Sequence, residues 1–163
     1  MADHLDAAYN LARWILPIEA DAEDVVHDAF LRAMNGYAGF RGENARAWIL
    51  TIVRNTAYNF IRDRANKKSE PIDSGLEEVL ASNDCDPIER LLAEERRGAL
   101  QAALLALPPE YREALVLREF EELSYRQIAA MQSVPVGTVM SRLARAREKL
   151  RSTLKRRTTN DRL

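Results

Sequence analysis

The chain has 163 residues, of which 47% are hydrophobic and 30% charged, which is typical of a soluble globular protein with one ordinary domain or two small ones. No apolar run approaches the length of a membrane span, and the N-terminal MADHLDAAYN lacks the pattern of a signal peptide, so we expect a cytoplasmic protein without membrane insertion. The single cysteine, Cys85, excludes an internal disulfide and has no companion metal ligands.

The net charge of -1 conceals a strong asymmetry along the chain. Residues 1–65 carry 7 basic and 9 acidic side chains, residues 66–95 carry 3 and 9, and residues 96–163 carry 14 and 7. The last third therefore has a net charge of +7, which is the electrostatic footprint of a nucleic-acid-binding protein.

The first predicted helix runs from Asp3 to Leu16, and Pro17 closes it because proline cannot continue the helical hydrogen-bond pattern. Its apolar side chains recur at helical spacing, so we expect them to face the core. They are Leu5, Ala8, Leu11, Ala12 and Ile15.

The second predicted helix runs from Asp21, a suitable N-cap, to Asn35, after which Gly36 is well placed to end it. One side of this helix is apolar and should face the core. The opposite side is acidic and yet contains a leucine, so it is either a solvated face or a docking face for a basic partner helix. The core positions are Ala22, Val25, Val26, Ala29, Phe30 and Ala33, and the opposite face comprises Asp24, Asp28, Leu31 and Asn35.

The third predicted helix runs roughly from Ala45 to Asn66, after a loop that contains three glycines. One face is apolar, whereas the other interleaves aromatic side chains with amides and an arginine. This mixture suits unstacked bases, because rings stack on bases and amides read base edges. The alternative is that the aromatic residues simply complete the core. The apolar face comprises Ala45, Ile49, Ile52, Val53, Thr56 and Phe60, and the polar face Trp48, Thr51, Asn55, Tyr58, Asn59 and Arg62.

An acidic linker is predicted between the third helix and the next one. The stretch from Ser69 to Glu89 contains 7 acidic residues and no basic ones, and it is interrupted by prolines and a glycine. Such a linker either keeps two domains apart or lies along a positively charged channel in a partner. Beyond it, one helix is predicted to start at Pro87, with Asp86 as its N-cap, and another at Pro109.

The stretch from Leu123 to Arg151 has the pattern of a helix-turn-helix. Ser124 and Gln127 have capping-box spacing at the start of a short helix, and the residues around Pro135 form the turn before a second helix. That second helix divides into an apolar stripe and a polar cationic face, as major-groove recognition requires, although a solvated basic helix has the same appearance. The stripe is Val139, Leu143, Ala146 and Leu150, and the polar face is Thr138, Ser141, Arg142, Arg145 and Lys149.

Two motifs in this order resemble the extracytoplasmic-function group (group 4) of sigma-70-type RNA polymerase sigma factors. DAEDVVHDAFLRA followed by FRGENARAWILTIVRNTAYNFIRDR resembles sigma domain 2, and LPPEYREALVLREFEELSYRQIAAMQSVPVGTVMSRLARAREKLR resembles sigma domain 4. Two positions differ from the family pattern, since His27 stands where glutamine is usual and Met140 where lysine or arginine is common. Together with the linker, the two motifs cover nearly the whole chain.

The resemblance implies a role for each of these surfaces. The second helix would bind the clamp helices of the polymerase largest subunit. The polymerase flap would be a further contact of the chain. The third helix and the loop before it would open the minus-ten element, the helix from Val136 would read the minus-thirty-five element, and the linker would thread the RNA channel. The implied sites are Asp24, Asp28, Leu31 and Arg32 for core polymerase, Phe40, Arg41, Trp48, Asn55, Tyr58, Asn59 and Arg62 for minus ten, and Thr138, Ser141, Arg142, Arg145 and Lys149 for minus thirty-five.

The sequence therefore predicts an all-α protein of two small helical domains joined by an acidic flexible linker. We expect domain 2 at 1–66, the linker at 67–86, domain 4 at 87–157 and a tail at 158–163. The predicted function is transcription initiation with core RNA polymerase and promoter DNA, controlled by an anti-sigma factor, with a free chain that is monomeric. The alternative is a helix-turn-helix response regulator or repressor that acts without polymerase. No catalytic residue, metal or cofactor is predicted, because two histidines and one cysteine form no recognisable set.

Overall fold

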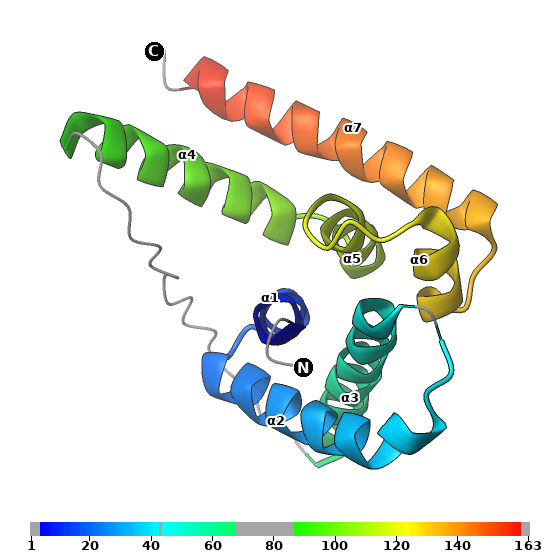
Figure 1. The fold of residues 1–163 in the computed structure, drawn as a ribbon. Helices are drawn as coiled ribbons and strands as arrows, with labels where there is room; N and C mark the ends of the chain where they lie inside the picture. Colours follow the sequence, from blue (N-terminus) through cyan, green and yellow to red (C-terminus); the bar gives the residue numbers. More distant parts are fainter. Residues whose placement is uncertain (1–3, 43, 68–86, 161–163) are drawn as a thin grey trace.

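The residues described by the computed structural model, 4–42, 44–67 and 87–160, form seven α-helices and one short 3₁₀ turn, with no strand among them (Figure 1). The all-α prediction is confirmed for this part of the chain. Apart from Lys67, the predicted linker lies outside the described residues, and so does Cys85.

The N-terminal half of the molecule consists of three helices. They are α1 (Leu5–Ile15), α2 (Glu19–Gly36) and α3 (Ala45–Lys67), with a 3₁₀ turn at Tyr37–Gly39 between α2 and α3. Their small and branched side chains form a core of their own, in which Ala12, Val25 and Val53 are fully or almost fully buried. Because alanines dominate the faces of α1 and α2, these helices pack closely against α3.

The C-terminal half contains four helices. They are α4 (Pro87–Leu105), α5 (Pro109–Glu119), α6 (Tyr125–Gln132) and α7 (Val136–Asn160). Helix α5 is the central one, because the four consecutive residues 114–117 are all buried. The buried run extends around the helix, and α5 is accordingly in contact with α1, α6 and α7.

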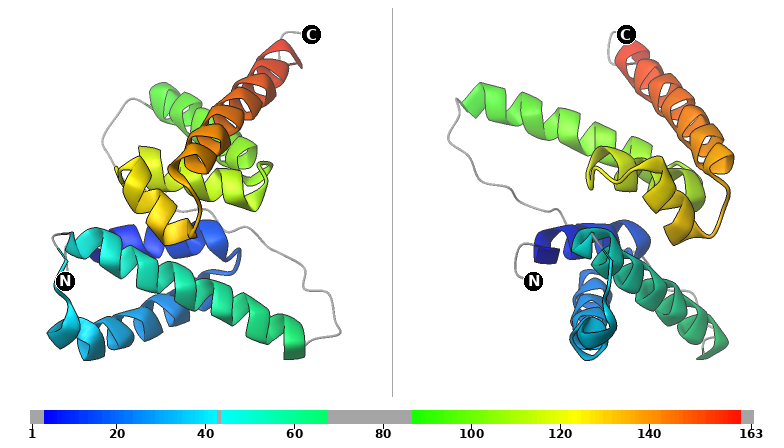
Figure 2. Two further views of the ribbon diagram at one scale, coloured as in Figure 1. Left: turned by 90° about the vertical axis from the view of Figure 1, so that its right-hand side faces the viewer. Right: turned by 45° about the vertical axis from the view of Figure 1, so that its right-hand side comes forward.

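The two halves pack directly against each other (Figure 2). Helix α1 lies against α5, and α3 also touches α6. Leu11 and Leu50 from the N-terminal half are fully buried in the same hydrophobic cluster as Leu107 and Leu117 from the C-terminal half. Burial of each such leucine stabilises the folded state by about 2 kcal/mol. The two halves therefore share a hydrophobic core.

Several predicted helix boundaries and one predicted core position are wrong in detail. Helix α2 begins at Glu19 rather than Asp21, and Asp21 forms an ion pair with Arg64 of α3 instead of capping the helix. Leu5 is 49% exposed because it lies in the first turn of α1, at the end of the helix. Lys67, assigned to the linker, is the last residue of α3. Five other predicted core residues are half-buried and pack against the hydrophobic clusters: Ile15, Phe30, Ile52, Phe60 and Leu150. Ala45 is also half-buried.

Candidate nucleic-acid interface

The predicted helix-turn-helix is present as α6 and α7. Ser124 N donates to Gln127 Oε1 at 2.8 Å and Gln127 N donates to Ser124 Oγ at 3.2 Å, which completes the capping box at the start of α6. Ser133 then adopts a left-handed conformation, with φ of 54°, and ends the helix. This local geometry follows directly from the sequence and orients α7 after a sharp turn.

Helix α7 separates its two faces as predicted. Val139, Leu143 and Ala146 are buried against α5 and α6, whereas the polar residues lie on the outer side. The outward surface also includes Met140, which is 54% exposed. Ser141, Arg145 and Lys149 are exposed, and Thr138 and Arg142 are half-buried.

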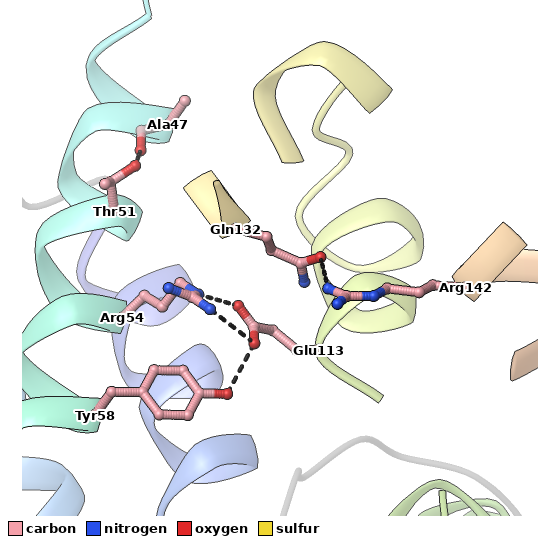
Figure 3. A network of polar contacts seen from close by, with 7 residues as sticks. All are labelled: Ala47, Thr51, Arg54, Tyr58, Glu113, Gln132 and Arg142. Carbon is pink, nitrogen blue, oxygen red and sulfur yellow. Dashed lines mark hydrogen bonds and ion pairs between the residues drawn. The ribbon is translucent and has the colours of Figure 1, made fainter. Parts of the chain in front are cut away.

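Arg142 and Arg145, the two arginines of this face, have different hydrogen-bond partners. Arg142 Nη1 donates to Gln132 Oε1 at 2.9 Å, so its guanidinium is held against α6 (Figure 3). Arg145 Nη1 donates to the Tyr111 hydroxyl at 3.4 Å, and this hydrogen bond raises the pKa of the Arg145 guanidinium. Arg145 therefore carries a permanent charge on an exposed side chain with one weak neutral partner, and that leaves it available for an anion or a base edge.

Several of the residues predicted for base binding gather around one recess beside α3. The cavity has a volume of about 490 Å³ and lies between α2, the 3₁₀ turn and α3. Phe40 and Trp48 form one wall, with ring centroids 4.7 Å apart and planes inclined by 33°. Asn55 and Asn59 face the same recess from successive turns of α3. Aromatic rings and amides around one recess suit an unstacked base, because rings stack on bases and amides read base edges.

Tyr58 does not belong to this recess. Its hydroxyl donates to Glu113 Oε2 of α5 at 2.8 Å, and Glu113 also forms an ion pair with Arg54 of α3 (Figure 3). Burial, followed by the charge of Glu113, raises the pKa of the Tyr58 phenol, so the hydroxyl remains a neutral donor. Tyr58 is thus engaged with the C-terminal half, contrary to its expected place on a free polar face.

A second buried carboxylate, Glu121, also joins the two halves. Glu121 accepts hydrogen bonds from Asn10 Nδ2 at 2.9 Å and from Arg46 Nη2 at 2.5 Å. The side chains of Glu113 and Glu121 are only 4% and 2% exposed. We call these four pairs, in which two buried carboxylates of the C-terminal half meet N-terminal donors, the closing contacts.

The remaining predicted residues lie on the outer surface. Leu31 is 48% exposed, and Asp24 is exposed beside it on α2. Asp28 and Arg32 form an exposed ion pair one helical turn apart, with Nε and Oδ2 separated by 2.9 Å. Arg41 is exposed in the loop, and Arg62 Nη2 donates to Asn59 Oδ1 at 2.9 Å. The acidic face of α2 is therefore an open surface.

Sequence reasoning missed Arg46, Arg54, Glu113 and Glu121. One signal for Glu113 was present, because it immediately precedes the apolar run 114–117 and a carboxylate beside such a run requires a buried partner. Within the described residues, no cluster of three potential metal ligands occurs and no helix is long and apolar enough to cross a membrane.

Comparison with known families gives two matches along the chain. Residues 1–67 match the model of sigma-70 region 2, and residues 97–150 match that of sigma-70 region 4.

Curated relatives show the same relationship. Over 152 residues the chain is 36% identical to the ECF RNA polymerase sigma factor SigE of Mycolicibacterium smegmatis, which covers 93% of this chain and 58% of that protein. Over 138 residues it is 36% identical to the ECF RNA polymerase sigma-E factor of Escherichia coli K12, covering 78% of this chain and 71% of that protein.

Two solved structures share the arrangement of the helices. The sigma factor RpoE of Bartonella quintana, in complex with the anti-sigma factor NepR, superposes with a TM-score of 0.78 at 28% identity, over 93% of this chain and 92% of that one. CnrH, in complex with the cytosolic domain of CnrY, superposes with a TM-score of 0.63 at 26% identity, over 94% of this chain and 84% of that one.

Proposed function

Because the chain belongs to the extracytoplasmic-function sigma factors of the sigma-70 family, we propose that it is a bacterial transcription initiation factor. It binds core RNA polymerase in the cytoplasm and directs the enzyme to specific promoters. The observation that carries this proposal is the presence, in one chain, of a recess with an aromatic wall beside α3 and a basic face on α7. The domain limits proposed for these tasks are 1–66 and 87–157.

Core polymerase binds the open face of α2. An exposed leucine beside two carboxylates suits a helical partner that has a basic surface. The proposed contacts are Asp24, Asp28, Leu31 and Arg32. The clamp helices of the largest polymerase subunit are the partner that the family implies.

The recess beside α3 receives a base of the minus-ten element. A flipped base loses a few kcal/mol of stacking and pairing, and stacking on Trp48 or Phe40 offsets part of that loss. Asn55 and Asn59 supply the hydrogen bonds to the base edge. Arg41 and Arg62 lie on exposed surface nearby and provide phosphate contacts.

Helix α7 reads the minus-thirty-five element in the major groove. Ser141 and Arg145 are nearest the bases, with Arg142 held in place by Gln132. Thr138 and Lys149 contact the backbone at the two ends of this face.

The packing of the two halves implies that they separate when the protein binds a promoter. The two promoter elements are named after positions minus ten and minus thirty-five, which lie about 25 base pairs apart. At 3.4 Å per base pair this separation is roughly 85 Å. Helices α3 and α6 touch each other in the arrangement described here, so the two reading faces cannot span that distance. The closing contacts must therefore break, which also releases Tyr58 for the minus-ten face.

Control by an anti-sigma factor is part of the proposed function. RpoE from Bartonella quintana is similar to this chain over most of its length and is bound to an anti-sigma factor in its solved structure. A helix-turn-helix regulator that acts without polymerase is less favoured, because it gives no role to the recess beside α3 or to the face of α2.

Reconstitution with purified core polymerase tests the proposal. We expect a stable complex, together with initiation from a distinct set of promoters in a genomic library. High-affinity binding of the free chain to duplex DNA, without complex formation or initiation, would assign it instead to the regulators that act alone.

A further inference from the structure

A cavity between the two halves has the chemistry of a small-molecule site. It has a volume of about 590 Å³ and is lined by α1 on one side and by α4 and α5 on the other. Pockets for small ligands commonly measure about 300–1,000 Å³ and often lie between domains. We call this cavity the inter-half pocket.

The walls of the inter-half pocket combine apolar surface with cations. Trp14, Leu100 and Phe120 supply apolar area, and Leu100 and Phe120 remain 37% and 47% exposed. The cationic residues are Arg13, Arg97 and Arg112, and the described lining contains no carboxylate. Three guanidinium groups around an apolar pocket without an acid favour an anionic occupant.

The hydrogen bonds of these cations are incomplete. Arg13 donates to the carbonyl of Pro17, and Arg112 donates to the carbonyls of Trp14 and Leu107. Within the described residues, the Nε atoms of Arg13 and Arg112 and the indole nitrogen of Trp14 are buried without an acceptor. Burial lowers the pKa of the Arg112 guanidinium, as expected for a cation that has neutral partners only. Three donor nitrogens of residues that line the pocket therefore lack an acceptor.

From these observations we infer that the inter-half pocket binds an amphiphilic carboxylate, with its apolar chain against Trp14, Leu100 and Phe120 and its carboxylate among the three arginines. The cavity of about 590 Å³ offers these apolar side chains to a hydrocarbon chain and the guanidinium groups to its carboxylate.

Occupancy of the pocket has a regulatory consequence, which rests on the proposed function. The ligand touches α1 and α4 together only while the two halves are packed. A ligand that binds one arrangement better than another shifts the population toward it. The amphiphile therefore holds the closing contacts together and lowers promoter-directed initiation.

Calorimetric titration of the full chain with decanoate, below its micelle concentration, tests the site directly. We expect binding at one site and a roughly tenfold weaker affinity for Arg97→Glu, since a reversed charge faces the carboxylate. Arg96→Glu is the matched control, because Arg96 is the exposed neighbour on α4 that does not line the pocket. Equal weakening by both variants, or equally tight binding of the cationic decyltrimethylammonium, overturns the proposal.

In vitro transcription tests whether binding in the inter-half pocket affects initiation, and it distinguishes a failure of this site from a failure of the proposed function. Decanoate should inhibit the wild type and Arg96→Glu at lower concentrations than it inhibits Arg97→Glu. Binding that depends on Arg97 without any effect on initiation overturns the regulatory consequence. If the chain never initiates with core polymerase but still binds decanoate through Arg97, the proposed function fails and the site is supported.

Discussion

Helices α3 and α7 both carry a face suited to nucleic acid, yet their surroundings differ. The face of α7 points outward, and Ser141, Arg145 and Lys149 are exposed. The face of α3 is divided between an open recess at Trp48 and a covered part at Tyr58, which is bound to Glu113 of the other half.

If both faces bind DNA as proposed, the difference indicates that they become available under different conditions. The surface of α7 is ready in the packed arrangement, whereas full use of α3 requires the halves to separate. Four predictions test this asymmetry, in order of decreasing expected effect.

The largest effect is expected for Glu113→Gln. Loss of the buried carboxylate leaves Arg54 uncompensated and should weaken packing of the halves by about 3 kcal/mol. Fluorescence energy transfer between dyes on α2 and α7 should report a longer mean distance in the free chain. Glu119→Gln is the control, because Glu119 pairs with Arg147 on the surface within one half, and exposed pairs contribute less than about 1 kcal/mol. Equal mean distances between the dyes in the two variants would show that Glu113 does not hold the two halves together.

Arg145→Ala is expected to reduce discrimination between minus-thirty-five sequences by about 10- to 100-fold, the usual value of one good base contact. Competition binding of the holoenzyme to promoter variants measures it. Arg151→Ala is a suitable control, because Arg151 is exposed beyond the predicted reading face. A uniform loss on every sequence would make Arg145 a phosphate contact.

Asn55→Ala should impair promoter opening by roughly fivefold, the value of about 1 kcal/mol for one hydrogen bond to a base edge. Permanganate reactivity of unpaired thymines measures opening, and co-elution with core polymerase should be unchanged, because Asn55 lines the recess and is not among the proposed contacts of core polymerase. Normal opening by this variant would exclude Asn55 from the minus-ten site.

The smallest effect concerns pH. The pKa of Tyr58 is raised in the packed arrangement, so packing favours the protonated phenol and its contribution is complete below the ordinary tyrosine pKa of about 10. Packing should weaken as the pH rises above about 10, where the separated halves lose the phenolic proton first. The same energy-transfer signal measures this, and Tyr58→Phe should reduce its dependence on pH. An identical pH profile in Tyr58→Phe would show that other groups cause the change.

Much of the fold and part of the site follow from local sequence. The capping box at Ser124 and Gln127 forms as predicted, because it involves residues three positions apart. The buried stripe of α7 and the gathering of Trp48, Asn55 and Asn59 around one recess also follow from helical periodicity. The predicted start of α2 was wrong because Asp21 has a stronger partner in Arg64, which is far away along the chain.

The sequence by itself determined the helices, their faces and the order of the two sigma-type motifs, because capping and periodicity depend on neighbouring residues. Only the tertiary structure decided that Tyr58 is covered and that the two halves share a core. Those outcomes depend on Glu113 and Glu121, which meet donors 55 to 111 positions away. No local pattern encodes which distant donor a buried carboxylate will meet, so the packed arrangement and its pocket emerge only when the two halves are in place.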